Sequence, residues 1–268
     1  MARFLLCLPL CLLLAPDYPR LASQEPQRAP ANPNTANSIG DPIAFLEQCL
    51  ERYDREVKGK GYTLILRKRE FIGGDLYPPE VIKVHFKDEP HSVFFEWLQK
   101  TERKALRVLY VKGENNDNLL ALANPRIFGV VSKAVDGDDA RQSGRYTIAE
   151  FGIKQAMQRI LKNWKKARAE NALHVEYEGI HTVREAGDRR CHKFHRTRYA
   201  KPEDGNVTEL ILYVDVETQL QVGSVLLGKD EQGNDGQLVG EYYFTEIDPK
   251  PTFGPDQFKP AALTAPWK

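Results

Sequence analysis

Cysteine is scarce in this sequence, and neither sign of charge dominates it. Two of its four cysteines, Cys7 and Cys11, lie in an apolar run near the start, so only Cys49 and Cys191 remain for the rest of the chain. This number excludes a small fold held together by several disulfides. Lys and Arg total 38 against 37 Asp and Glu, a formal charge of +1. Nucleic-acid binding normally requires a strong excess of positive charge, so we expect no nucleic-acid partner.

Sequence motifs of the common catalytic sites are also missing. The chain has no Gly-x-Ser-x-Gly nucleophile motif, no pair of histidines with an adjacent glutamate at the spacing of a zinc protease, and no phosphate-binding glycine loop. The glycines at 59–61 and 73–74 flank apolar segments and are typical of turns. The sequence therefore indicates a protein that is not an enzyme and needs no cofactor.

The first residues have the composition of an export signal. Arg3 precedes an apolar run at 4–15, which is too short to span a bilayer comfortably. We assign 1–23 to a cleaved signal peptide; a retained anchor or a lipoprotein modified at Cys7 or Cys11 are the alternatives. Residues 24–40 are rich in Pro, Ala, Asn and Gln and are predicted to be a disordered linker. The protein is thus expected in the periplasm or cell envelope, and not as an integral membrane protein after signal removal.

Two amphipathic helices are predicted. The first begins at Asp41 and Pro42, a residue pair that suits a helix N-terminus, and continues to about Gly59. The second extends from about 148 to 167, with apolar residues at helical spacing up to Trp164. Each helix has one apolar face and therefore has to pack on a larger apolar surface.

The remaining chain consists mostly of segments with strand composition, separated by polar turns. About ten strands are predicted, at 61–71, 81–86, 92–97, 107–111, 118–122, 173–183, 190–199, 207–216, 220–227 and 238–247. Short connections favour antiparallel pairing, and a sheet this large has to curl or split. The predicted fold class is α+β, mainly antiparallel β, as a single domain over 41–260 with a C-terminal tail at 261–268.

A few polar clusters were considered as metal sites. The segment from Cys191 to His195 contains Cys191, His192 and His195, with His181 earlier in the chain, but alternation along a strand lets at most two of the first three converge. The acidic run 136–139 lacks the spacing of a calcium loop. We predict no metal. Cys49 and Cys191 are either two buried thiols or, in an oxidising compartment, one disulfide.

Several segments resemble the periplasmic lipoprotein-carrier (LolA-like) superfamily, and in particular a bacterial family of exported domains of unknown function with that fold. These segments are 61–64 (Gly-Tyr-Thr-Leu), 76–80 (Leu-Tyr-Pro-Pro-Glu), 84–97, and 243–247 (Tyr-Phe-Thr-Glu-Ile) followed by Phe258. The resemblance extends from Asp41 to about Pro260. It implies an unclosed, strongly curved β-barrel with amphipathic helices across its mouth. The loops at 136–145 and 230–236 depart from the shorter carriers.

Aromatic residues supply the candidate binding site. Seven of them are candidates to line the concave face of the sheet: Phe86, Phe95, Trp97, Tyr110, Trp164, Tyr242 and Phe244. Phe95 and Trp97 share one strand face and Phe94 points to the other, so only one of these sets is interior. The predicted function is a non-catalytic carrier or sensor of a lipid-like or lipoprotein ligand, with a hydrophobic molecule or an acylated protein as partner. The alternative is an envelope scaffold or interaction module with a solid core, docked to an envelope protein.

Overall fold

The computed structural model describes residues 39–99, 105–124, 128–203 and 206–266, which belong to one compact unit beginning at Asn37. The predicted signal peptide and nearly all of the predicted linker lie outside these residues. Within the part that is described, no helix is both long enough and apolar enough to cross a membrane.

Helix α1 (Pro42–Glu56) begins where the sequence predicted. The Asp41 carboxylate accepts a hydrogen bond from the backbone N–H of Ile43 at 2.9 Å, and Pro42 occupies the first turn. This side-chain cap satisfies a donor that the first turn leaves without a helical partner. The helix ends at Glu56, slightly before the predicted Gly59, and buries Leu46, Cys49 and Tyr53.

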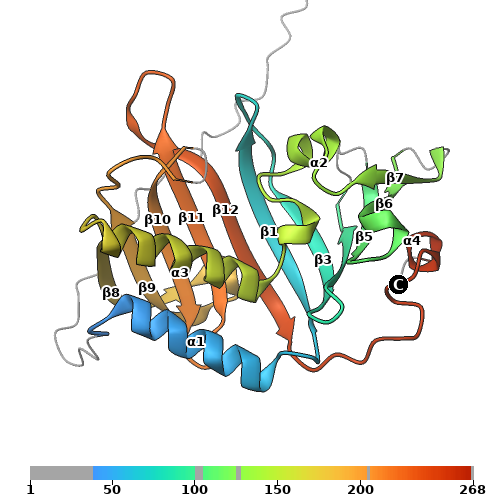
Figure 1. The fold of residues 1–268 in the computed structure, drawn as a ribbon, viewed down its shortest axis with the longest axis horizontal. Helices are drawn as coiled ribbons and strands as arrows, with labels where there is room; N and C mark the ends of the chain where they lie inside the picture. Colours follow the sequence, from blue (N-terminus) through green and yellow to red (C-terminus); the bar gives the residue numbers. More distant parts are fainter. Residues whose placement is uncertain (1–38, 100–104, 125–127, 204–205, 267–268) are drawn as a thin grey trace, which may run out of the picture. The chain divides into compact units, whose positions relative to one another are not determined.

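Twelve strands form one antiparallel sheet in the described residues (Figure 1). The first seven are β1 (Tyr62–Ile72), β2 (Asp75–Leu76), β3 (Glu80–Lys87), β4 (Ser92–Trp97), β5 (Ala105–Val111), β6 (Asn118–Ala123) and β7 (Val130–Ala134). After the helical segments come β8 (His174–Val183), β9 (Arg189–Thr197), β10 (Val207–Asp215), β11 (Gln221–Lys229) and β12 (Asp235–Asp248). Two of them were not predicted: β2 has only two residues, and β7 is mostly exposed and lies in a segment that was expected to be a loop.

The order of the strands brings the two ends of the domain together. It runs β7-β6-β5-β4-β3-β1-β12-β11-β10-β9-β8, with β2 paired to β1 alone. The early strand β1 and the last strand β12 therefore pair at the centre of the sheet, and β7 and β8 are its edges. No pairing joins these two edges in the described chain, so the sheet is curved but unclosed. The predicted fold class is confirmed.

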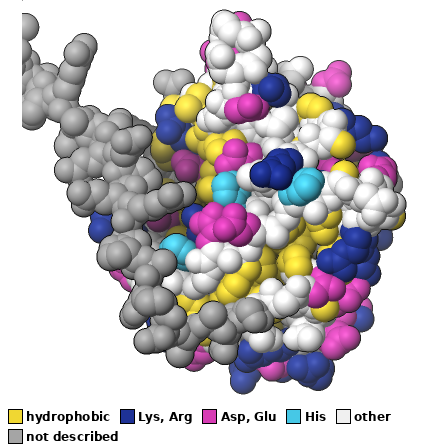
Figure 2. Space-filling view, turned by 90° about the vertical axis from the view of Figure 1, so that its left-hand side faces the viewer, with side chains coloured by type: hydrophobic (Ala, Val, Ile, Leu, Met, Phe, Trp, Pro, Cys, Tyr) yellow, Lys and Arg dark blue, Asp and Glu magenta, His cyan; other side chains and the backbone are white. Residues whose placement is uncertain are grey.

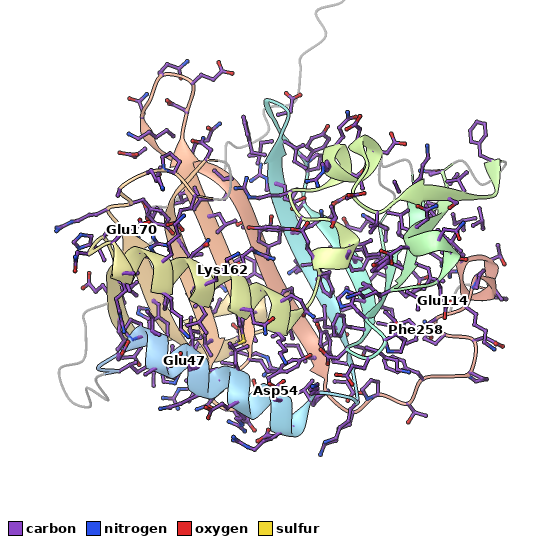
Figure 3. All side chains as sticks on the ribbon, viewed as in Figure 1. Glu47, Asp54, Glu114, Lys162, Glu170 and Phe258 are labelled. Carbon is purple, nitrogen blue, oxygen red and sulfur yellow. The ribbon has the colours of Figure 1, made fainter. Side chains whose placement is uncertain are left out.

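Helices α1 and α3 (Ile153–Ala169) lie side by side on the concave face (Figure 1). The second predicted helix begins later than 148, because a 3-10 turn (η3, Ile148–Glu150) and Gly152, with φ of 147°, precede it. Three ion pairs connect the two helices: Lys154 to Asp54, Lys165 to Glu47 at 2.6 Å, and Arg168 to Asp41 at 2.6 Å. Glu47 and Asp54 are labelled along α1 in Figure 3. The ion pairs join α1 and α3 into one layer.

Side chains fill most of the space beneath this layer. Met157 and Trp164 of α3 and Tyr53 of α1 are fully buried, and they belong to the same core cluster as Leu64 of β1 and Phe86 of β3. Such aromatic and aliphatic burial is the main stabilising term of the fold. The interior is therefore a packed core, with one smaller cavity described below.

The end of the chain packs against the opposite face of the sheet. Residues 261–264 form α4 (Ala261–Thr264), and Leu263 is fully buried with Phe94 and Leu109. The Arg107 guanidinium, 2% exposed, donates to the carbonyl oxygen of Ala265 at 2.6 Å. The sequence predicts a domain that ends at 260, followed by a tail at 261–268. In the structure the packed part continues to at least Ala265, because apolar Leu263 covers residues of β4 and β5.

A short helix replaces the loop expected after β7. Helix α2 (Asp138–Ser143) has Asp138 and Asp139 in its first turn, where their negative charge is favourable next to the free backbone N–H groups. The acidic run 136–139 thus includes the start of a helix.

Candidate functional site

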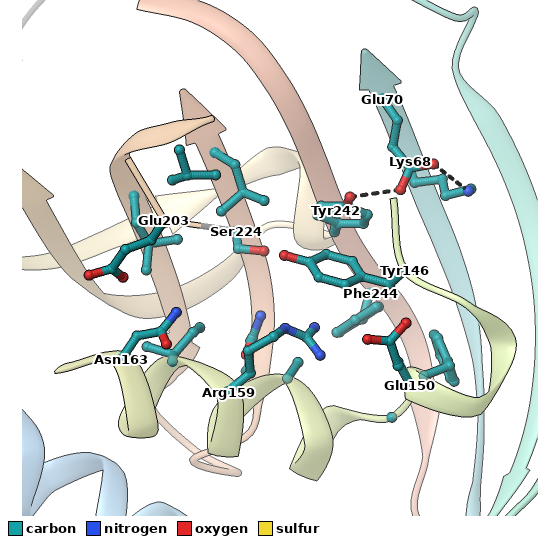
Figure 4. A pocket seen from close by; sticks show the side chains of 18 of the residues that line it. Lys68, Glu70, Tyr146, Glu150, Arg159, Asn163, Glu203, Ser224, Tyr242 and Phe244 are labelled. Atoms are coloured by element: carbon teal, nitrogen blue, oxygen red, sulfur yellow. Dashed lines mark hydrogen bonds and ion pairs between the residues drawn. The ribbon is translucent and has the colours of Figure 1, made fainter. Parts of the chain in front are cut away.

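A cavity of about 100 Å³ lies between α3 and the concave face of the sheet. Its walls come from β1, β12 and β11, from α3, and from the segment 146–152 that leads into α3 (Figure 4). Strand alternation explains the contribution of β1: Leu66, Lys68 and Glu70 are two residues apart and share the face that looks toward α3. On the neighbouring strand, Phe244 pairs with Leu66 and Tyr242 with Lys68.

Aromatic rings form the apolar part of the cavity. The Phe95 ring contacts Phe151 edge to face, with 5.0 Å between centroids, and Phe151 in turn contacts Phe244 at 6.3 Å. Trp164 and Ile160 add to the lining from α3. Such a surface suits the hydrocarbon part of a ligand, since its burial removes apolar area from water.

One side of the cavity carries a buried charged cluster. The Lys68 ammonium lies 2.6 Å from Oε2 of Glu70 and 3.4 Å from Glu80, and Tyr242 donates to Glu70 at 2.7 Å. Burial of Glu70, only 2% exposed, raises its pKa, but Lys68, Tyr242 and the backbone N–H of Arg145 together outweigh burial. The net result is a lowered pKa, so Glu70 is ionised at neutral pH.

A second charged pair lies on the other side. The Arg196 guanidinium donates two hydrogen bonds to the Glu203 carboxylate, both of 2.8 Å, and its Cζ lies 3.9 Å from the ring centroid of Tyr199. Arg196 is 2% exposed. This paired arrangement is strong and rigid because the planar guanidinium matches the carboxylate.

Three cavity-lining side chains keep a buried polar atom without a hydrogen-bond partner among the described residues. These atoms are Nε1 of Trp164, Nε of Arg196 and Oε1 of Gln221. Buried polar groups are normally satisfied, because leaving one unpaired is costly. The cavity therefore favours a ligand with some polar atoms over a pure hydrocarbon.

Two more guanidinium groups contact the lining residue Tyr146: that of Arg159, which also lines the cavity, and that of Arg145, which does not. The Cζ of Arg159, on α3, lies 3.9 Å from the Tyr146 ring centroid, and that of Arg145 lies 6.0 Å away. Arg159, Tyr146 and Glu150 are labelled in Figure 4. Glu150 accepts hydrogen bonds from the backbone N–H and the hydroxyl of Thr147, at 2.8 and 3.0 Å.

Four of the seven aromatic candidates line this cavity: Phe95, Trp164, Tyr242 and Phe244. The other three do not. Phe86 stacks on Tyr62 with 4.6 Å between centroids, the Trp97 indole donates to Glu80 at 3.0 Å, and the Tyr110 hydroxyl donates to Asp117 at 3.0 Å. Phe86 and Trp97 lie behind the cavity wall, since their rings contact the lining residues Phe151 and Phe95 with centroids 6.1 and 6.0 Å apart. Phe94 points to the opposite face, as alternation required, and packs with Leu263.

The possible disulfide is not formed. Cys49 and Cys191 are free and buried in two different clusters, Cys49 on the helix side with Phe194 and Cys191 on the other face with Val222. The sheet lies between them, because residues 191 and 194 of β9 point to opposite faces. Burial raises the pKa of each thiol to about 12.

The histidines near Cys191 take part in hydrogen bonds on the β8–β10 strands. His195 lies between two carboxylates, 2.9 Å from Glu178 and 2.7 Å from Glu209, and His192 contacts the Tyr177 hydroxyl at 2.9 Å. Figure 2, which faces the β8 side, shows histidines beside acidic side chains. No group of three or more His, Cys, Asp or Glu in the described ranges is arranged to hold a metal ion.

A family model described as "Protein of unknown function (DUF1571)" matches residues 59–264. The chain belongs to this family. A comparison with curated proteins finds no match. The structure has the unclosed, curved antiparallel sheet that the resemblance to the LolA-like superfamily implied.

Several solved structures are similar over most of the chain. A DUF1329 family protein from Desulfovibrio piger is 11% identical, with a TM-score of 0.41, and covers 83% of this chain and 99% of its own. A LolA superfamily protein from Nitrosomonas europaea is 9% identical, with a TM-score of 0.38 and coverages of 81% and 99%. The lipoprotein LppX from Mycobacterium tuberculosis is 9% identical, with a TM-score of 0.41 and coverages of 79% and 96%. We draw no functional argument from such distant matches.

Sequence reasoning missed the charged part of the site. Lys68 and Glu70 continue the face of β1 that carries Leu64 and Leu66, and Arg196 shares a face of β9 with Phe194. A charged residue at a position that alternation assigns to the core was the available signal, since such residues are buried only when paired. The candidate site of this DUF1571 protein is thus amphipathic rather than purely aromatic.

Proposed function

We propose that the protein is a non-catalytic carrier or sensor of a lipid-like amphiphile, which binds between α3 and the concave face of the sheet. The observation that carries this proposal is the cavity itself: aromatic rings on one part of its wall and paired or unpaired polar groups on the rest. An amphiphile offers both kinds of surface.

Loading requires the helical layer to move. A cavity of about 100 Å³ is smaller than the roughly 300–1,000 Å³ of most small-molecule sites. The ligand's chain would replace contacts that Met157, Leu161 and Trp164 of α3 make with the sheet. Because three ion pairs connect α3 to α1, the two helices move together in this proposal.

Burial of the ligand's apolar surface is sufficient to give an affinity in the micromolar range. A Kd of 1 μM corresponds to roughly 8 kcal/mol. At about 25 cal/mol per Å², that free energy requires on the order of 330 Å² of apolar surface, and more once the cost of moving the helices is included. A single long acyl chain is the kind of ligand that supplies this area.

The test combines extraction with a variant that fills the cavity. Protein purified from its native host is extracted and analysed by mass spectrometry for co-purifying amphiphiles, and binding of a fluorescent fatty acid is measured. Ala156 of α3 lines the cavity, so Ala156→Leu is expected to weaken binding at least tenfold. Ala169→Leu, at the exposed end of the same helix, is the control and is expected to bind as the unaltered protein does. Equal binding by both variants, or the absence of any co-purifying amphiphile, contradicts the proposal.

A second candidate function is an envelope scaffold or interaction module without a ligand. The tight interior favours it: Trp164, Tyr53, Tyr62 and Phe86 are fully buried, and they leave little space under the helices. The same experiment separates the two functions. A scaffold retains no amphiphile and is insensitive to Ala156→Leu.

A further inference from the structure

Arg159, which lines the cavity, and Arg145, which contacts the lining residue Tyr146, have no acidic partner among the described residues. Neither Arg145 nor Arg159 forms an ion pair or a side-chain hydrogen bond with any described residue. The Nε and Nη2 atoms of Arg145 are buried and unpaired. Both guanidinium groups contact the ring of Tyr146, at 3.9 Å for Arg159 and 6.0 Å for Arg145.

The other cations that line the cavity, Lys68 and Arg196, are paired with carboxylates. Lys68 is bound by Glu70 and Glu80, and Arg196 is held at two points by Glu203. Glu150 is the remaining carboxylate of the lining, and its Oε2 atom accepts from Thr147 instead of from an arginine. The guanidinium groups near the cavity that lack a carboxylate partner among the described residues are therefore the two beside Tyr146.

We propose that Arg145 and Arg159 bind the anionic head group of a single-chain amphiphile, a carboxylate or a phosphate, at the edge of the cavity beside Tyr146. The inference rests on the proposed function and adds the chemical class of the ligand. Guanidinium groups match the oxygen atoms of a carboxylate or phosphate with parallel hydrogen bonds, and they hold this geometry better than an ammonium does. The Tyr146 ring orients the Arg159 plane by a cation–π contact.

The position of Arg159 also determines where the acyl chain of the ligand lies. Arg159 lines the cavity together with Phe151 and Phe244, so a head group bound at its guanidinium has the aromatic wall next to it. An unpaired guanidinium in a partly buried place is unfavourable in the empty protein, since its donors are desolvated. The anion relieves this cost, and selectivity for charged over neutral amphiphiles follows.

The experiment compares ligands that differ only in the head group. Binding of hexadecanoate, hexadecyl phosphate and hexadecanol to the purified protein is measured by displacement of a fluorescent probe. The unaltered protein is expected to bind the two anions at least tenfold more tightly than the alcohol, with a preference that weakens as salt is added. The anion that binds more tightly identifies the preferred head group as a carboxylate or a phosphate.

Arginine variants assign the effect to residues. Arg159→Gln and Arg145→Gln are each expected to weaken binding of the anions at least tenfold and to leave hexadecanol unchanged. Arg159→Lys is expected to bind the anions more tightly than Arg159→Gln but less tightly than the unaltered protein, because lysine keeps the positive charge and lacks the planar guanidinium group. Arg55→Gln, an exposed position on α1, is the matched control and is expected to have no effect. Thermal unfolding of each variant verifies that it is folded.

The outcomes distinguish a failure of the head-group assignment from a failure of the proposed function. If all three ligands bind with similar affinity, or if the glutamine variants weaken hexadecanol as much as the anions, the head-group assignment is wrong although the cavity binds amphiphiles. If none of the ligands binds and Ala156→Leu has no effect, the proposed function itself is wrong.

Discussion

The Tyr242 hydroxyl donates a 2.7 Å hydrogen bond to Oε1 of Glu70, across the pair of strands where the early part of the domain meets its last strand. Lys68 lies 2.6 Å from the other oxygen of the same carboxylate. The buried Glu70 carboxylate thus links β1 to β12 at the centre of the sheet, and it is also part of the cavity wall.

Acidification is expected to destabilise the protein through Glu70. Its pKa is lower in the folded chain than the ordinary value of 4.5, because Lys68, Tyr242 and Arg145 together outweigh burial. The stability it contributes is complete above pH 4.5 and is lost as the pH falls through the lower folded value. We expect Glu70→Gln to cost about 1–3 kcal/mol at pH 7 and to reduce the loss of stability on acidification. Urea unfolding at pH 7 and below pH 4 measures both; an unchanged pH dependence contradicts the assignment.

Two substitutions at Asp41 are expected to separate the contribution of the α1 cap from that of the ion pair with Arg168. Asp41 caps α1 through the Ile43 N–H and also binds Arg168, whose hydrogen bond lowers the Asp41 pKa to about 2. Asp41→Ala removes both and is expected to cost about 1–2 kcal/mol. Asp41→Asn retains an oxygen for the cap and loses only the charge, so a cost below about 1 kcal/mol is expected for an exposed pair. Equal losses in chemical unfolding of the two variants would show that the cap contributes nothing.

Arg107 is expected to hold the end of the chain in place. Its guanidinium donates to the Ala265 carbonyl at 2.6 Å and to Glu96 at 2.7 Å, and it is 2% exposed. Arg107→Ala leaves Glu96 without this partner, and a loss of about 3–5 kcal/mol is expected in urea unfolding. Lys259→Ala breaks only an exposed pair with Asp256 and is expected to change stability by less than about 0.5 kcal/mol. A loss below about 1 kcal/mol for Arg107→Ala contradicts this role.

Both cysteines of the domain are expected to resist thiol reagents while the protein is folded. Burial raises the pKa of Cys49 and Cys191 to about 12, so almost no thiolate exists at pH 8. Peptide mapping after treatment with iodoacetamide is expected to find both unmodified in the native protein and both modified in urea. Modification of either in the native state shows that its cluster opens.

Much of the β-structure could be read from alternation along the chain. Alternation of side chains along β4 predicts Phe95 and Trp97 on one face and Phe94 on the other, and the structure has this arrangement. Which set faces the helices depends on what covers each side, and no local pattern contains that information. The same limit explains the end of the domain, because the burial of Leu263 depends on β4 and β5, about 150 residues earlier.

The start of α3 illustrates a different limit. Apolar spacing predicted a helix from 148, yet the structure has a 3-10 turn there, and Gly152 interrupts it with φ of 147°. Residues with a side chain rarely adopt a φ of 147°, so this position favours glycine. The interruption turns segment 146–152 toward the sheet and makes it a wall of the cavity.

Ten of the strands, the α1 cap and the fold class follow from local features of the sequence, because these depend on periodicity, turn residues and side-chain oxygens within a few positions. The cavity, its charged residues and the separation of the two thiols depend instead on how the elements pack. The Tyr242 hydroxyl meets Glu70, 172 residues earlier, and the Arg107 guanidinium meets the Ala265 carbonyl, 158 residues later, because segments from separate parts of the chain pack side by side. Contacts of this kind depend on the positions of elements that are distant in the chain, and residue spacing alone does not encode them.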